Sequence, residues 1–397
     1  MSDSTLAEPG VTAASPRLSS GVTVLLLLSL GHFFVDLYSG ALGALQPVFV
    51  QRLSLSLTQA GILGGVFIFS SSVMQLTWGL LSDRIRSRMF AVAGPAVAAV
   101  CIASLGLAPG YAWLLVLAVL GGSGVAAFHP QASSAVASAT AHRRAGWMAV
   151  FISAGTLGFS LGPTYFSQIL ELFGPTRLYW AAVPGVVMAG LLTATLPAPA
   201  GPVPPASSRV RIKALACVWK PLTILYFLVF FRSILQVAFA QFLPLYLHLE
   251  RGMPLSSANY TLSFYLASGA LGGFLGGHLS DRLGGKTVIL ISMAGCLPFL
   301  AIFFMASGTL AAASLAAGGL ILFFTIPVNI VMAQTLVPSQ GGTVSALMMG
   351  FAWGMAGVIS IPLVGWASDL FSMHQVLFSL LVFPIVGFAL ALKLRTS

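Results

Sequence analysis

Long apolar stretches alternate with short polar ones along almost the whole chain. Twelve such stretches can be distinguished, and each approaches or exceeds the roughly 20 residues that a helix needs to cross a membrane. They lie near residues 22–50, 57–81, 90–107, 112–139, 147–171, 178–196, 221–247, 255–279, 287–306, 309–335, 342–368 and 375–393. The pattern predicts an all-α membrane protein with twelve transmembrane helices.

Two segments interrupt this pattern. Residues 1–20 are polar and rich in Ser, Ala and Pro, and we expect them to form a disordered tail. Residues 197–220 contain the sequence PAPAGPVPPASSRVRIK, whose composition is typical of a linker. We therefore expect two six-helix bundles, at residues 21–196 and 221–397, joined by the linker at 197–220.

Composition excludes most other classes of protein. The chain has 397 residues, of which 58% are hydrophobic and only 7% are charged, whereas soluble proteins average about 25% charged residues. A soluble enzyme and a disordered chain are excluded. The three cysteines are too few and too scattered for a disulfide framework or a zinc site, and no metal is expected. They are Cys101, Cys217 and Cys296.

The basic residues predict the orientation. The net charge of +10 would suggest nucleic acid in a soluble protein, but here the basic residues lie mostly between apolar stretches. If the N-terminus is cytoplasmic, fourteen Lys and Arg residues fall on the cytoplasmic side and three on the other. By the positive-inside rule, both termini are cytoplasmic. We expect lipid around the protein and no nucleic-acid partner.

The chain repeats itself at half its length. The sequence GLLSDR from Gly79 recurs as GHLSDR from Gly277, 198 residues later, and Thr58 aligns with Ser256 at the same offset. Two homologous six-helix halves are the plan of one large class of transporters.

Each copy of the repeated sequence lies where the second helix of a half meets a short basic loop. Its Asp can pair with Arg or cap a neighbouring helix, and such a contact can be made and broken between conformations. We predict cytoplasmic latches at Asp83 with Arg84 and at Asp281 with Arg282. The duplicated sequence resembles the loop signature of the major facilitator superfamily. This resemblance implies a secondary transporter with no ATP site.

Asp36 is the one carboxylate deep within a predicted span. A charge there is costly and usually marks a functional site that faces a cavity. His32 lies one helical turn earlier on the same face. A protonatable Asp beside a His suits a proton-coupled carrier, and we predict that these two residues couple transport to protons. The alternative is a structural hydrogen bond or ion pair.

Arg232 is the one basic residue within a predicted span. It lies on the seventh helix, and it aligns within about a residue of Asp36 after the half-chain shift. Its guanidinium keeps its charge and must find an anion or a dipole. It would pair with Asp36, bind an anionic substrate together with Gln236 one turn away, or do both. A purely structural pairing is the alternative.

The fourth helix carries GGSGVAAFHPQASS from Gly121, in which Pro130 would bend the helix beside His129 and Gln131. At the half-chain offset, Asn329 on the tenth helix matches Gln131. Distorted helices with polar residues line transporter sites, so we predict that these residues contact solute near the midplane. A packed, hydrogen-bonded histidine is the alternative.

Several segments together resemble the fosmidomycin-resistance family of bacterial drug exporters. They are GHFFVDLYSGAL from Gly31, GSGVAAFHPQASSAVA from Gly122, SAGTLGFSLGP from Ser153 and VSALMMGFAWGMAGV from Val344. Asp36 and the sequence Phe128-His129-Pro130 match the family pattern, whereas Gln131 stands where the family often has Glu. Gly158-x3-Gly162-Pro163 is similar to the fifth-helix motif of drug/proton antiporters. Fosmidomycin is an anion, which is compatible with Arg232.

The sequence thus predicts a monomeric transporter of the bacterial inner membrane that moves a small organic solute by alternating access. Export in exchange for protons is the favoured interpretation, with the proton gradient as energy source and no cofactor. An uptake symporter for an organic anion is the nearest alternative. A transport-dead sensor or scaffold is a second alternative. Such a protein normally needs an appended signalling domain, and the tail and the linker are too short to hold one. An enzyme is not expected, because no paired carboxylates or nucleophile–base spacing occurs.

Overall fold

The computed structural model describes residues 20–85, 87–139, 144–196 and 212–394, and within these ranges all regular structure is helical. The first half contains α1 (Ser20–Ser39), α2 (Ala41–Leu53), α3 (Leu57–Ile68), η1 (Phe69–Val73), α4 (Gln75–Arg84), α5 (Met89–Ser104), η2 (Leu105–Leu107), α6 (Tyr111–Ala139), α7 (Arg144–Phe173), η3 (Pro175–Ala182) and α8 (Val183–Thr195). The second half contains α9 (Ile212–Cys217), α10 (Trp219–Leu245), η4 (Tyr246–Glu250), α11 (Leu255–Leu283), α12 (Gly285–Met305), α13 (Gly308–Leu322), α14 (Thr325–Leu336), η5 (Pro338–Gln340), α15 (Gly341–Ser345), η6 (Ala346–Ala352), α16 (Trp353–Leu370), α17 (Met373–Ser379) and α18 (Val382–Leu392).

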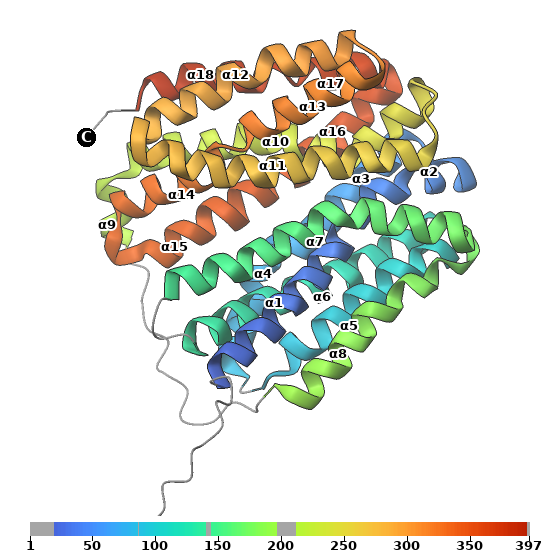
Figure 1. Ribbon diagram of the computed structural model, residues 1–397, viewed down its shortest axis with the longest axis horizontal. Helices are drawn as coiled ribbons and strands as arrows, with labels where there is room; N and C mark the ends of the chain where they lie inside the picture. Colours follow the sequence, from blue (N-terminus) through green and yellow to red (C-terminus); the bar gives the residue numbers. More distant parts are fainter. Residues whose placement is uncertain (1–19, 86, 140–143, 197–211, 395–397) are drawn as a thin grey trace, which may run out of the picture.

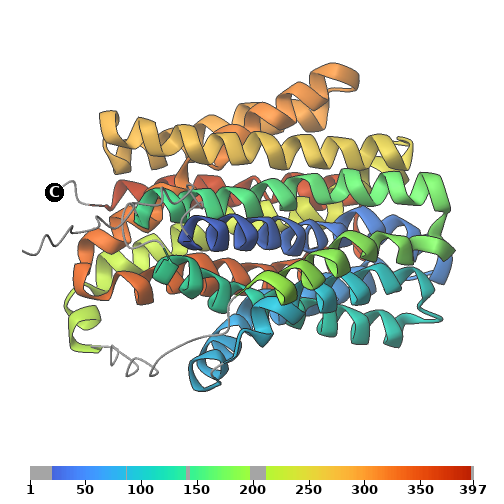
Figure 2. The same cartoon turned by 60° about the horizontal axis from the view of Figure 1, so that its bottom comes forward.

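Consecutive elements join into long rods that run roughly side by side (Figures 1 and 2). Within the described ranges, ten helical stretches are long and apolar enough to cross a membrane. The helices α7 and α11, of 30 and 29 residues, complete the set of twelve. The prediction of an all-α, twelve-helix membrane fold is confirmed.

Each half packs around its own apolar side chains. One buried cluster draws only on residues between Leu25 and Leu196. Two others draw on residues from Leu222 onward, with Ala60 and Ile68 contributed by the first half. Residues 1–19 of the predicted tail and most of the predicted linker lie outside the described residues, whereas Ser20 begins α1 and α9 lies within the remaining part of the linker.

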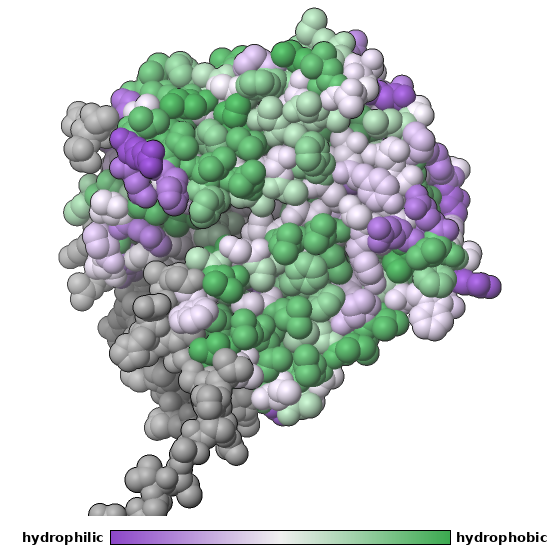
Figure 3. Space-filling model, in the orientation of Figure 1, coloured by the Kyte–Doolittle hydropathy of each residue, from purple (hydrophilic) through white to green (hydrophobic). Residues whose placement is uncertain are grey.

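The outer surface suits a lipid environment. In the view of Figure 3, hydrophobic residues cover the middle of the visible face, and hydrophilic residues gather toward its two ends. Large apolar side chains such as Leu76, Trp113 and Phe274 are more than half exposed. In water such a surface would drive aggregation, whereas in a bilayer it faces lipid tails.

The halves are joined at one end of the bundle. We call the end where α1 begins and α18 ends the termini end, and the opposite end, where α3 and α11 begin, the far end (Figure 1). Every hydrogen bond that joins the halves in the described ranges lies in the part of the bundle toward the far end. The pairs are Ala44–Asn259, Gln46–Gln241, Gln51–His248, Leu57–Asp369, Thr58–Asp369 and Thr164–Ser263.

Glycines allow this close contact. A Cβ on Gly43 would overlap the carbonyl oxygen of Ala240, so α2 and α10 meet backbone to backbone. On the α3–α16 contact, a Cβ on Gly61 would lie 2.6 Å from the carbonyl oxygen of Ile361. The far end is therefore closed by backbone packing as well as by hydrogen bonds.

Candidate functional site

A cluster of three titratable side chains lies inside the first half. His32 and Asp36 extend from α1, and His129 extends from α6. One carboxylate oxygen of Asp36 lies 3.2 Å from His32 Nε2, and the other lies 3.3 Å from His129 Nε2. The two Nε2 atoms are themselves 3.2 Å apart. The sequence placed His32 beside Asp36, and the structure adds His129 to the same contact.

Backbone carbonyls fix the tautomers of both histidines. Nδ1 of His32 lies 2.8 Å from the carbonyl oxygen of Phe151, and Nδ1 of His129 lies 2.8 Å from that of Val125. A carbonyl only accepts hydrogen bonds, so both Nδ1 atoms donate. In neutral imidazoles the two Nε2 atoms are then acceptors, and they face each other and a carboxylate. A proton on one of these Nε2 atoms would turn its contact with the carboxylate into a hydrogen bond.

Gly155 on α7 leaves room for this cluster. A Cβ at this position would overlap Nε2 of His32 and would lie 2.7 Å from an oxygen of Asp36. Three residues further on, a Cβ on Gly158 would overlap the carbonyl oxygen of Phe33. The glycines of this segment therefore let α7 lie directly against α1. The sequence alone gives Gly155 no role, although it lies in the segment SAGTLGFSLGP.

Arg232 lies in the second half, on α10, and is only 4% exposed. It donates to the side-chain oxygen of Gln236 and, at 3.0 Å, to the hydroxyl of Ser233. Its Nε has no partner among the described residues, and its guanidinium lies 6.0 Å from the ring centroid of Phe323. In the same ranges no carboxylate comes within ion-pair distance of it, so the structure does not pair Arg232 with Asp36.

Further side chains of the second half have buried polar atoms without a hydrogen-bond partner in the described structure, among them Asn329 and Tyr265 as well as Ser360 and Ser368. Asn329 on α14, which packs against α10, is fully buried, and neither atom of its amide is hydrogen-bonded in the described structure. The hydroxyl of Tyr265 on α11 is likewise unpartnered there. The ring of Tyr265 lies 5.8 Å from that of Phe323, the same ring that Arg232 approaches. Unsatisfied buried polar groups are costly, and a fully buried amide with no partner marks a candidate place for a ligand.

The structure does not bring Gln131 to either group. Its side-chain oxygen accepts from the backbone N–H of Ala91 at 2.6 Å, and its amide donates to the carbonyl of Ser87. Ala91 belongs to the first turn of α5, whose N–H groups have no partner within the helix. In this conformation Gln131 therefore caps α5 and fixes the loop before it, whereas His129 contacts Asp36.

The predicted latch residues lie at the termini end, at the ends of α4 and α11. Arg84, Asp281 and Arg282 are not buried, and none of them forms an ion pair with a described residue. The side chain of Asp83 lies outside the described part of the chain. The latch assignment stays a prediction.

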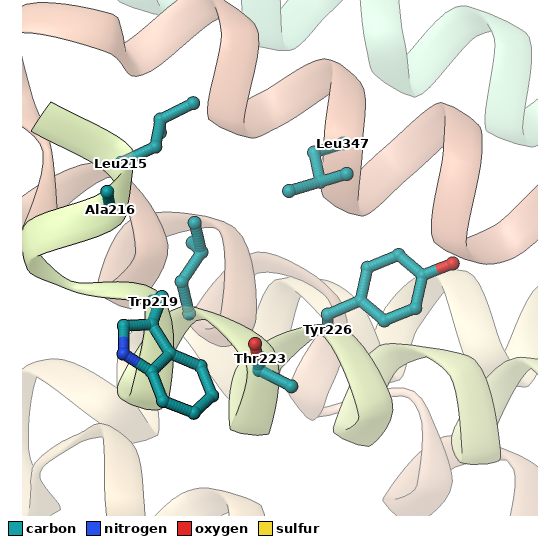
Figure 4. Close-up of a pocket in the computed structure, with 7 residues that line it drawn as sticks. Leu215, Ala216, Trp219, Thr223, Tyr226 and Leu347 are labelled. Atoms are coloured by element: carbon teal, nitrogen blue, oxygen red, sulfur yellow. The ribbon is translucent and has the colours of Figure 1, made fainter. Parts of the chain in front are cut away.

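A separate pocket of about 350 Å³ opens beside α9 at the termini end. Figure 4 shows Trp219, Thr223 and Tyr226 along one side of α10, with Leu347 of η6 facing them. The lining is apolar apart from two hydroxyls and the indole nitrogen. Neither Asp36 nor Arg232 is among the residues that line this pocket, and we do not assign the functional site to it.

Among the described residues, His32, Asp36 and His129 form the one group of three or more His, Cys, Asp or Glu residues whose possible metal-ligand atoms all lie within 4.8 Å of one another. Structural zinc sites usually have four protein ligands. Because each pair of atoms lies at hydrogen-bond distance, protons alone can hold this cluster together.

Comparisons with known proteins identify the family. The sequence pattern of the Major Facilitator Superfamily matches residues 28–361. The chain belongs to this superfamily. It is 27% identical to the fosmidomycin resistance protein of Escherichia coli (strain K12), covering 95% of this chain and 94% of that protein. It is 28% identical to the uncharacterized MFS-type transporter YfnC of Bacillus subtilis (strain 168), covering 98% and 94%.

Solved transporters share the fold. An inward-facing, unoccupied bacterial homologue of the human lysosomal transporter Spinster superposes with a TM-score of 0.81 at 16% identity, covering 95% of this chain and 97% of that one. The nucleoside transporter NupG gives a TM-score of 0.76 at 13% identity, covering 94% and 100%. The fold and the relatives are those of multi-pass membrane transporters of small molecules.

Proposed function

We propose that this member of the superfamily exports a small organic anion across the bacterial inner membrane in exchange for protons. The observation that carries the proposal is the contact of Asp36 with two histidines inside the first half. A carboxylate and two imidazoles at hydrogen-bond distance bind and release protons as their access to water changes. The likeness to the fosmidomycin resistance protein supports export and an anionic solute.

Arg232 supports the anionic solute. A guanidinium in a span needs a negative partner, and here its neighbours are neutral. A carboxylate or phosphonate of the solute would supply the missing charge and could accept bidentate hydrogen bonds. Asn329, Gln236 and His129 would contact the rest of the solute.

The orientation follows from charge. Six basic residues at described helix ends lie at the termini end, which the positive-inside rule assigns to the cytoplasm. They are Arg84, Arg88, Lys220, Arg282, Lys286 and Lys393. The far end would then be the outer side, and its closure would make this an inward-facing conformation. The latches at Asp83 and Asp281 would close the termini end in the opposite conformation.

The test compares cells that express the protein with cells that lack it and with cells that express Asp36→Asn, in which proton-driven transport is expected to be lost. Drug susceptibility and accumulation are measured for a panel of anionic and cationic compounds that includes fosmidomycin. Resistance with lower accumulation of anions supports the proposal. Higher accumulation and sensitisation would instead establish the uptake symporter, and resistance restricted to lipophilic cations would contradict the anion site. No flux of any compound, in protein shown to be inserted, would favour the sensor or scaffold.

A further inference from the structure

Asp369, at the end of α16, closes the far end by capping a helix of the other half. The backbone N–H groups of Leu57 and Thr58 each donate to its carboxylate at 2.8 Å, and the hydroxyl of Thr58 donates to it as well. These N–H groups begin α3 and have no partner within that helix. Ser56 accepts from the next N–H, that of Gln59, at 3.1 Å, so the first turn of α3 is fully capped.

The internal repeat offers an equivalent position for comparison. At the half-chain offset of 198 residues, Asp369 corresponds to Glu171 at the end of α7, and Thr58 corresponds to Ser256 at the start of α11. The same contact between Glu171 and α11 would therefore be expected. In the described structure no hydrogen bond joins them, and α11 has no side-chain cap. Glu171, Leu255 and Ser256 line an open pocket of about 330 Å³ instead.

The helix packing next to Asp369 also differs from the packing next to Glu171. Next to Asp369, Gly61 and Gly65 of α3 pack on Pro362 of α16, and a Cβ on Gly365 would overlap the carbonyl oxygen of Leu57. Between α7 and α11 the contact is made by side chains instead: the hydroxyl of Thr164 donates to the hydroxyl of Ser263 at 2.8 Å. A π-helical segment adjoins each helix of the α3–α16 pair: η1 follows α3, and η6 precedes α16. The helices α7 and α11 are continuous.

We infer that Asp369 is the latch of the far end, and that its release from α3 is a required step in opening that end. The contact joins two elements more than 300 residues apart, one from each half, so the halves cannot separate there while it holds. A carboxylate at a helix N-terminus is stabilised by the helix dipole. Glu171 marks a symmetric position at which the equivalent contact is absent from the described structure.

The inference rests on the alternating access of the proposed function, and it is independent of proton coupling and of the solute. It therefore predicts the opening of the far end in protein that has neither a gradient nor a substrate.

The test measures how fast a buried thiol at the far end reacts. Cys101, Cys217 and Cys296 are replaced by Ala, and Ser263, a buried residue on α11, is replaced by Cys. The alkylation rate of this thiol by a hydrophilic maleimide in purified full-length protein reports the open fraction. Asp369→Ala should raise this rate about five-fold, which corresponds to about 1 kcal/mol and to the loss of a helix cap. Asp369→Asn keeps one acceptor and should raise it less.

Two controls make the result decisive. Glu171→Ala, the symmetric variant, should leave the rate within about two-fold, a difference of about 0.4 kcal/mol. A second background keeps only the natural Cys296, which is buried in the core of the second half and reports unfolding. The inference is overturned if Asp369→Ala leaves the Ser263→Cys rate unchanged. It also fails if Glu171→Ala raises the rate equally, or if Cys296 reacts faster in Asp369→Ala by the same factor.

Discussion

The two halves hold their buried charges in opposite ways. In the first half, Asp36 has a histidine on each carboxylate oxygen, and both histidines are held by backbone carbonyls. In the second half, Arg232 has only neutral partners for its guanidinium, and Asn329 and Tyr265 have none in the described structure. We propose that a proton completes the first group and that an anionic ligand completes the second. The half-chain repeat aligns Asp36 and Arg232 within about a residue, so two nearly equivalent positions carry opposite charges.

The largest expected effect is that of Asp36→Asn, which removes the charge and keeps the shape. Solute flux driven by a pH gradient in proteoliposomes should fall to the level of protein-free vesicles. Solute exchange without a gradient should persist, because the Asn amide can still hydrogen-bond to His32 and His129. Full gradient-driven flux in the variant would show that Asp36 does not carry the proton, and His32 would become the candidate. Loss of exchange as well would indicate a structural role.

Arg232→Gln tests the other side of the comparison. We expect the affinity for an anionic solute to fall at least about ten-fold, since hydrogen bonds to charged groups contribute roughly 1.5–3 kcal/mol. Arg232→Lys should retain part of the affinity, because a cation remains. Isothermal titration of the purified protein with the anion identified in the susceptibility panel checks both. Normal binding to Arg232→Gln would contradict the anion site.

Gly155→Ala should disturb the first group without changing any titratable residue. The added Cβ would overlap His32 Nε2, so the cluster must shift. We expect gradient-driven flux to fall several-fold with a smaller change in solute affinity. Gly190→Ala on α8 is the matched control, since a Cβ there meets no atom within 4 Å. Equal effects of the two alanines would mean that room beside His32 is unimportant.

The smallest effect expected is on stability alone. Gln131→Ala removes a cap from the first turn of α5, and we expect it to destabilise the protein by about 1 kcal/mol, as losses of helix caps do. Gln131→Glu keeps the acceptor for Ala91 N–H and should be less destabilising. Thermal unfolding in detergent measures both, and solute affinity should be unchanged. A clear loss of affinity in Gln131→Ala would return this residue to the solute site.

Much of the fold could be predicted because it depends on composition and periodicity. A chain with 7% charged residues has only lipid as a suitable solvent, and twelve apolar stretches of spanning length imply twelve helices. The duplicated GxLSDR sequence pointed to the superfamily, since a pattern repeated at half-chain spacing is specific. Asp36, His32 and Arg232 stood out because polar and charged residues within spans are rare.

Contacts between distant helices could not be predicted in this way. His129 and Gln131 are two residues apart, and their places on α6 direct one to Asp36 and the other to the start of α5. Gly155 leaves room for His32 only because α7 packs against α1, which the local sequence does not show. The repeat aligns Glu171 with Asp369 equally well, and nothing in the local sequence shows that Asp369 holds a helix across the halves while Glu171 does not.

The solvent, the helices, their repeat and the buried charges could all be inferred from the chain, because each depends on residue type and on spacing along a single helix. Which of these charges meet is a different kind of property. It depends on how closely two helices approach and on which faces they turn toward each other, and packing between distant segments decides both.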